Sequence, residues 1–154
     1  MTYKELLRIC KHIAVATVNE DCSPHNTPLF YAVNEELTKI YFASRAESLH
    51  TINFVRDGRA FAALYDSNEF NGGLYLTITN GRKVYDDDMK EAVEVYRKQL
   101  DKWDNTALKD DFYLLEGGYN LYVGDIKKIE TYKNKVDEND KLIEEWREEI
   151  DVRK

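Results

Sequence analysis

The residues with the clearest capacity for chemistry lie close together in the first third of the chain. Two hydroxyls, a guanidinium and an imidazole occur between positions 44 and 50, as Ser44, Arg45, Ser48 and His50. Ser48 is a suitable N-cap, and the first N–H groups of a helix have no partner within the helix. Together with the helix dipole, these groups suit a phosphate. A solvent-facing turn between a strand and a helix needs the same residue types, so both interpretations stay open here.

A strand and a helix are expected to position these side chains. The apolar segment 40–43 predicts the strand. The segment after Ser48 predicts a helix that ends at Gly58, a typical C-terminal cap. The apolar residues of this helix indicate its inner side, which we expect to carry Leu49, Ile52 and Phe54 or Val55.

A second polar group lies between two prolines, where His25, Asn26 and Thr27 are flanked by Pro24 and Pro28. Proline has no N–H to donate to a strand ladder. We therefore expect this segment to be a strand edge or a bulge, with unpaired backbone groups available to a ligand. A plain edge strand that its prolines protect is the alternative.

Other constellations of reactive residues are rejected. Cys22 and His25 are three positions apart, but no second pair completes a zinc site, and the other two histidines, His12 and His50, are scattered. The acidic run 86–88 is typical of a solvated helix start. The chain contains no nucleophile elbow, HExxH, P-loop or GxGxxG motif. We therefore expect no metal, and no catalytic side chain is predicted.

Composition limits the classes of function. The 154 residues suffice for one domain with a core, and no apolar run is long enough to span a membrane. The net charge of -7 argues against a nucleic-acid surface. Residues 1–7 carry no signal peptide, and Cys10 and Cys22 form no paired framework. We therefore expect a cytoplasmic protein with no nucleic-acid or membrane partner.

The order of the elements predicts a mainly β protein with flanking helices, in the form of a six-stranded split β-barrel. The segment 13–18 is apolar without a break, so we expect it to be buried on both faces. Strands are expected at 13–18, 25–33, 40–43, 59–66, 74–84 and 120–132, with helices from 2, from 48 and from 86.

Two regions are expected along the chain. Residues 1–133 form the barrel domain. Residues 134–154 form a charged linker and a C-terminal amphipathic helix. The apolar stripe of that helix would dock on the barrel or on a partner subunit, and it consists of Leu142, Ile143, Trp146 and Ile150.

The chain resembles the pyridoxamine 5'-phosphate oxidase-like FMN-binding split-barrel family in an ordered set of segments that covers about residues 5–132. The segments are Ile13-Ala-Val-Ala-Thr-Val, Asp21-x-Ser-Pro-His-Asn-Thr-Pro and Ile40-Tyr-Phe-Ala-Ser-Arg-x-x-Ser-x-His-x-x-Asn53. The resemblance implies a homodimer with FMN at the dimer interface. It implies the FMN phosphate at residues 44, 45 and 48–50, and the isoalloxazine ring or ribityl chain beside residues 25–27. The cofactor-binding residues that it implies are His25, Asn26, Thr27, Phe42, Ala43, Ser44, Arg45, Ser48, Leu49, His50 and Asn53.

The resemblance implies an FMN-dependent oxidoreductase that acts on a small molecule, with NAD(P)H as a candidate electron donor. In pyridoxamine phosphate oxidases an Arg stands where this chain has Thr27, and a Lys stands near the position of His50. Their C-terminal Arg-Leu-x-Pro signature is absent from this sequence. The substrate therefore stays open. The alternatives are a flavin carrier or sensor without turnover, and a split barrel that binds haem or a deazaflavin.

Overall fold

The protein was analysed as a computed structural model, which describes residues 2–65, 73–101 and 118–152. Three α-helices and a short 3-10 helix flank one antiparallel sheet in this part of the chain. The elements are α1 (Tyr3–Ile9), β1 (His12–Val18), β2 (Pro24–Phe30), β3 (Ala32–Val33), β4 (Lys39–Arg45), α2 (Leu49–Asp57), β5 (Ala60–Leu64), β6 (Leu74–Lys83), η1 (Asp86–Asp88), α3 (Met89–Asp101), β7 (Tyr119–Val136) and β8 (Leu142–Glu149). The expected strand 59–66 ends at a residue outside the described ranges.

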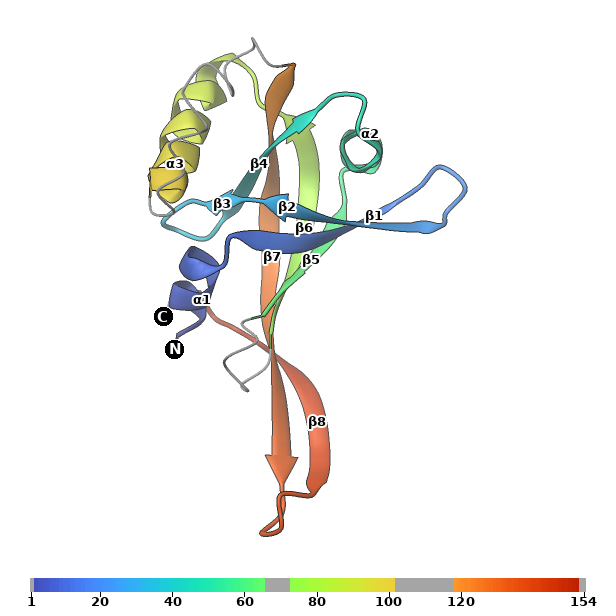
Figure 1. The fold of residues 1–154 in the computed structure, drawn as a ribbon, viewed down its shortest axis with the longest axis vertical. Helices are drawn as coiled ribbons and strands as arrows, with labels where there is room; N and C mark the ends of the chain where they lie inside the picture. The colour runs from blue at the N-terminus through green and yellow to red at the C-terminus, as the bar shows by residue number, and fades with distance from the viewer. Residues whose placement is uncertain (1, 66–72, 102–117, 153–154) are drawn as a thin grey trace.

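The sheet curls until its two end strands meet. Its strand order is β2-β1-β5-β6-β7-β4-β3, with β8 added to β7. The strands β2 and β3 stand at opposite ends of this order, yet only Tyr31 separates them in the chain. Tyr31 is buried, and its hydroxyl donates to the carbonyl of Leu7 in α1 at 2.7 Å. In Figure 1, β1 and β2 cross steeply over β6 and β7, as this curvature requires.

The mainly β fold with flanking helices is therefore confirmed, whereas the number of strands differs from the expected six. The described residues contribute eight strands, because Tyr31 divides the expected second strand and the C-terminal segment adds β8. The strand β1 is also not buried on both faces. Ile13, Val15 and Thr17 are buried, whereas Ala14 and Ala16 on the other face are only half-buried in a single protomer.

The first helix begins as the sequence predicts. The Thr2 hydroxyl accepts from the Glu5 N–H at 3.2 Å, and the Glu5 carboxylate accepts from the Thr2 N–H at 2.6 Å. This capping box orients α1 so that Leu6 and Leu7 enter the core. No helix in the described ranges is long and apolar enough to cross a membrane.

The rotation of α2 about its axis is set by Phe54. A Cβ atom at Gly81 would lie 2.6 Å from Phe54 Cε2, and one at Gly124 would lie 2.8 Å from Phe54 Cζ. The ring therefore fits only because β6 and β7 carry glycine there. Thr51, Asn53 and Phe54 are the buried residues of the helix. The expected inner side was wrong except for Phe54, because the residues that are about half exposed are Leu49, Ile52 and Val55.

The C-terminal segment is a β-hairpin, and the expected amphipathic helix was wrong. The strand β7 continues through the expected domain boundary to Val136, and residues 137–141 turn the chain back into β8. The Asp137 carboxylate accepts from the N–H groups of Asn139 and Lys141 at 2.9 Å, and Asp140 adopts a positive φ. This turn chemistry and the pairing with β7 override a helical apolar spacing that strand geometry also accommodates.

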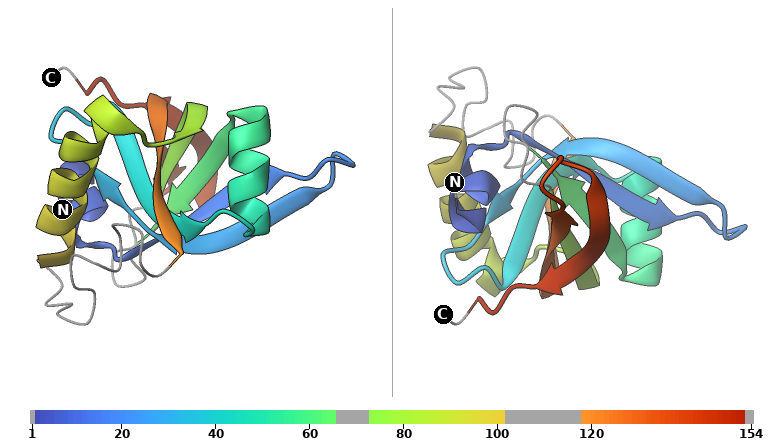
Figure 2. Two further views of the ribbon diagram at one scale, coloured as in Figure 1. Left: turned by 90° about the horizontal axis from the view of Figure 1, so that it is seen from above. Right: turned by 90° about the horizontal axis from the view of Figure 1, so that it is seen from below.

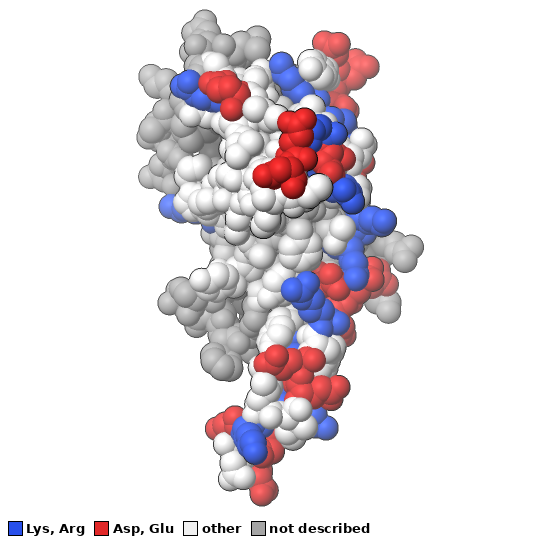
Figure 3. Space-filling view, turned by 90° about the vertical axis from the view of Figure 1, so that its right-hand side faces the viewer, with Lys and Arg blue, Asp and Glu red and all other residues white. Residues whose placement is uncertain are grey.

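The hairpin projects from the body of the molecule (Figure 1), and acidic and basic side chains are interspersed along it (Figure 3). Lys135 faces Glu144 across the two strands. Arg147 anchors the base of the hairpin because its guanidinium lies 4.2 Å from the ring centroid of Tyr75. Of the expected apolar stripe, only Ile150 packs against the core, whereas the exposed members are Leu142, Ile143 and Trp146.

Candidate functional site

The turn between β4 and α2 presents an uncapped helix N-terminus. Ser48 occupies the N-cap position with φ -67° and ψ 136°, as the sequence predicts, but its side chain makes no capping hydrogen bond. Its own N–H donates to the carbonyl of Arg45 at 3.2 Å, which closes the turn. The first N–H groups of α2 therefore remain available to an anion, together with the hydroxyl of Ser48.

A hydrogen bond between the end of β4 and the first turn of α2 lies beside this N-terminus. Ser44 Oγ and His50 Nε2 are 2.7 Å apart. Ser44 is buried and His50 is half-buried. Burial lowers the pKa of His50, and the nearby His25 lowers it further. Since the ordinary pKa of histidine is about 6.5, His50 is uncharged at neutral pH.

Arg45 supplies the permanent positive charge of the site. Its guanidinium lies 5.3 Å from the ring centroid of Tyr119, the residue opposite it on β7. A Glu47 oxygen lies 3.6 Å from Arg45 Nη1. The side chain is 54% exposed and can turn toward a ligand without breaking a buried contact. Sequence analysis missed Tyr119, because nothing near it in the chain reveals that β7 pairs with β4.

The polar group between the prolines lies on an edge strand. Within the described residues β2 pairs only with β1, in an unbroken register from Pro24 to Phe30, so the edge is confirmed and the bulge is not. His25 Nε2 lies 2.9 Å from the hydroxyl of Thr27, and Asn26 is exposed. His25 lowers the pKa of His50, which indicates that this strand lies near the start of α2.

The other predicted cofactor-binding residues differ in their burial. Phe42 is buried, and its ring stacks on Tyr122 at 5.6 Å between centroids. Asn53 is fully buried, and its amide donates to Thr17 Oγ1 at 3.2 Å and to Asn19 Oδ1 at 2.8 Å, which holds α2 against β1. The remaining two are the half-buried Ala43 and the half-exposed Leu49. Nowhere in the described ranges do three His, Cys, Asp or Glu side chains gather as metal ligands would.

Comparison with known proteins identifies the fold. No family model matches the sequence, and no curated protein matches it. Among solved structures, a Clostridium acetobutylicum protein related to general stress protein 26 of the pyridoxinephosphate oxidase family superimposes with a TM-score of 0.65. It is 16% identical, over 96% of this chain and 91% of that one. An F420 reductase has a TM-score of 0.61 and 17% identity, over 84% and 96% of the two chains.

The haem storage protein HutZ from Vibrio cholerae has a TM-score of 0.59 and 15% identity, over 82% of this chain and 89% of that one. Identities this low show the fold alone. The protein therefore has the fold of the pyridoxamine 5'-phosphate oxidase-like proteins, which confirms the resemblance at the level of architecture.

Proposed function

We propose that this protein is a flavoprotein that binds FMN, with the phosphate at the turn between β4 and α2. The observation that carries the proposal is the uncapped N-terminus of α2, at a turn that also carries the side chains of Ser44, Arg45 and Ser48. Ser48 leaves the first N–H groups of the helix open. Arg45 and Ser44 approach the same turn from the end of β4. A fork of donors, hydroxyls and a helix dipole are the groups that hold phosphate in proteins.

Before a phosphate binds, the site carries little net positive charge. Arg45 is the fixed cation, and Glu47 opposes it at the surface. His50 is neutral in the free protein, since burial and His25 lower its pKa. A phosphate beside the imidazole would favour its charged form, so that binding of the anion brings a second cation into the site.

The flavin ring would lie along β2. The outer edge of this strand has no strand partner in the described part of the chain, so its backbone can donate to and accept from the polar rim of the ring. His25 and Thr27 are already hydrogen-bonded to each other and would form a fixed wall. Bound flavin supplies the redox chemistry, and the chain supplies binding and orientation, so the proposed activity is oxidation or reduction of a small molecule.

A second copy of the chain would complete the site. The outer face of β1 and β5 carries Ala14, Ala16, Phe61 and Ala63, and Ala14 and Ala16 pair directly with Ala63 and Phe61. All four are half-buried in a single protomer. An apolar face that adjoins β2 suits a twofold interface, and we therefore propose a homodimer with the flavin beside that interface.

The absorption spectrum of the purified protein, with mass spectrometry of the released ligand, tests the proposal. FMN is expected. A deazaflavin or haem would contradict it, and each is a specific alternative because structures of an F420 reductase and of a haem storage protein share this fold. Bleaching of the flavin by NAD(P)H would support an enzyme. A bound flavin that NAD(P)H and small-molecule reductants leave oxidised would support a carrier or sensor.

A further inference from the structure

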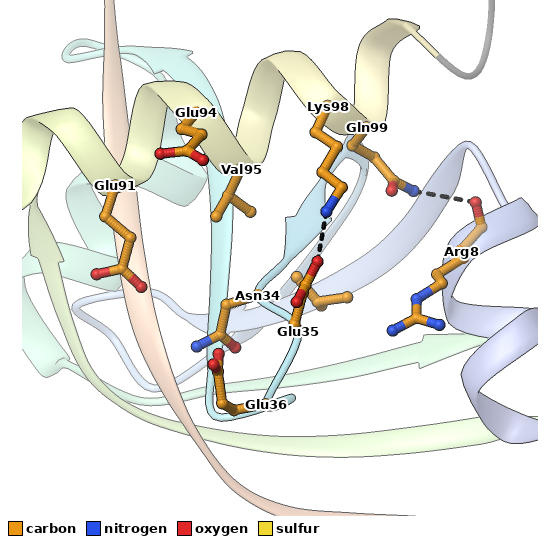
Figure 4. A pocket seen from close by; sticks show the side chains of 10 residues that line it. Arg8, Asn34, Glu35, Glu36, Glu91, Glu94, Val95, Lys98 and Gln99 are labelled. Carbon is orange, nitrogen blue, oxygen red and sulfur yellow. Dashed lines mark hydrogen bonds and ion pairs between the residues drawn. The ribbon is translucent and has the colours of Figure 1, made fainter.

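A separate cavity lies at the opposite end of β4 from the proposed FMN site. It has a volume of about 430 Å³, opens to solvent and is bordered by α1, α3 and the turn between β3 and β4 (Figure 4). The strand β4 begins at Lys39, which contacts Glu91 of the cavity wall, and ends at Arg45 of the phosphate site. A strand of this length spans about 20 Å. The cavity is therefore separate from the proposed phosphate site.

Two buried amides fix the frame of the cavity. Asn34 Oδ1 accepts from the N–H groups of Thr38 and Lys39, each at 2.9 Å, which holds the turn between β3 and β4. Gln99 Nε2 donates to the carbonyl of Arg8 at 3.1 Å, which joins α3 to α1. Asn34 is 6% exposed and Gln99 is 5% exposed. The walls are thus held in place by the chain itself, so a ligand would not have to order them.

The charges of the cavity are divided between its two ends. Figure 4 shows Glu91 and Glu94 toward one end and the guanidinium of Arg8 toward the other. Lys39 balances Glu91 at 3.1 Å. Glu94 makes no ion pair within the described part of the chain, and neither does the Arg8 guanidinium. The end at Glu91 and Glu94, with the exposed Glu36 near Asn34, therefore has an excess of carboxylate, and the Arg8 guanidinium at the other end carries N–H donors only.

The middle of the cavity is suited to a short aliphatic chain. Val33 from β3 and Val95 from α3 contribute its apolar wall. Glu35 and Lys98 satisfy each other as an ion pair between the two ends. The cavity volume lies within the range of about 300–1,000 Å³ that is usual for small-molecule sites.

We propose that this cavity binds a small zwitterion, an aliphatic amine that carries an acid group at the other end of a short methylene chain. The ammonium group lies at Glu91 and Glu94, the methylenes pass Val95, and the acid group lies at Arg8. Each charged end of such a ligand meets a side chain of opposite sign. The site is independent of the proposed flavin site.

The test uses the protein as purified and a series of ω-amino acids from β-alanine to 6-aminohexanoate, measured by calorimetry and by amide chemical shifts. One chain length is expected to bind best, with shifts confined to α1, α3 and the turn between β3 and β4. Butylamine and butyrate, which each lack one charge, are expected to bind at least about tenfold more weakly. If butylamine bound as tightly as the best ω-amino acid, or if only divalent cations bound, the proposal would be overturned.

Variants locate the site independently of the probe. Glu94→Gln and Arg8→Gln are each expected to weaken binding of the best ω-amino acid by about tenfold or more. Glu138→Gln and Lys127→Gln, at exposed positions of the β7–β8 turn and of β7, are the matched controls and are expected to leave it unchanged. Unaltered binding in Glu94→Gln and Arg8→Gln, or no binding by any member of the series, would refute the assignment. Flavin content, measured in parallel, is expected to stay the same in all four variants.

Discussion

The hydroxyl of Ser44 and the imidazole of His50 form a 2.7 Å hydrogen bond across the turn between β4 and α2. The bond joins the buried end of a strand to the first turn of a helix, beside N–H groups that no side chain caps. It therefore sets the position of the one group in the proposed phosphate site whose charge can change near neutral pH. The pH dependence of binding follows from this arrangement.

Affinity for FMN should fall as pH rises through the pKa that His50 has in the complex. In the free protein the pKa of His50 is lowered by burial and by His25, so the imidazole is neutral at pH 7. A bound phosphate raises that pKa, so binding takes up a proton between the two values. Fluorescence titrations between about pH 6 and pH 8 measure how steeply the dissociation constant of FMN changes with pH.

His50→Gln is the matched comparison for this dependence, because it keeps a polar side chain and cannot gain a charge. FMN itself titrates identically in both experiments, so the difference between the two slopes reports His50. The same pH dependence in the parent and in His50→Gln would show that His50 does not contact the phosphate.

Loss of the phosphate contacts should release FMN without unfolding the protein. The double change Arg45→Ala with Ser48→Ala removes a guanidinium and a hydroxyl from the proposed site. Affinity for FMN is expected to fall by about tenfold to a hundredfold. Riboflavin, which has no phosphate, should bind the parent much more weakly than FMN and should not distinguish the parent from the double variant. Fluorescence titration with both flavins measures these effects.

Arg59→Ala is the control for the loss of an exposed arginine. Its side chain is 75% exposed and pairs with Asp57, away from the turn. It should bind FMN as the parent does. Equal affinity of the parent for FMN and riboflavin would place the phosphate elsewhere.

The close contact between Phe54 and Gly81 should affect the free energy of unfolding. Gly81→Ala would place a Cβ atom 2.6 Å from Phe54 Cε2, inside van der Waals contact. Overpacking of this kind costs about 1–3 kcal/mol. Phe54→Leu removes the outer ring atoms, so Gly81→Ala should cost less in that background. Urea unfolding of the parent, the two single variants and the double variant gives the coupling free energy between the two positions. Additive effects would mean that α2 can shift away from β6.

The oligomeric state should depend on the outer face of β1 and β5. The parent is expected to be a dimer by light scattering at micromolar concentration. Ala63→Glu places a charge in the middle of this face without touching the core, so it should give a folded monomer that retains less FMN. Ile9→Glu, at an exposed position of α1, is the control and should stay dimeric. A monomeric parent, or a dimeric Ala63→Glu, would contradict the proposed interface.

Sequence analysis predicted most of what depends on near neighbours along the chain. The expected helix from residue 2, the C-terminal cap at Gly58 and the expected strand 74–84 all appear in the structure, the first as α1 and the last as β6. The N-cap position of Ser48 was predicted as well, although its side chain makes no capping bond. These features are set by local backbone geometry and by the period of the pattern.

Two errors have a common cause in contacts between distant segments. Leu49, Ile52 and Val55 have helical spacing, yet α2 turns Phe54 inward because Gly81 and Gly124 make room for its ring. The C-terminal segment also has helical spacing, yet it pairs with β7. In each case tertiary packing outweighs a weak local preference.

By itself, then, the sequence determined the residue types of the proposed phosphate site, the turn that presents them and the mainly β class of the fold. Only the tertiary structure decided that Tyr119 lies beneath Arg45, that His25 influences His50, and that α1 and α3 border a cavity beyond the other end of β4. The reason is physical. A cap, a turn or a strand period depends on a few neighbouring residues, whereas the partner of a side chain across a curled sheet depends on the register of strands that lie far apart in the chain.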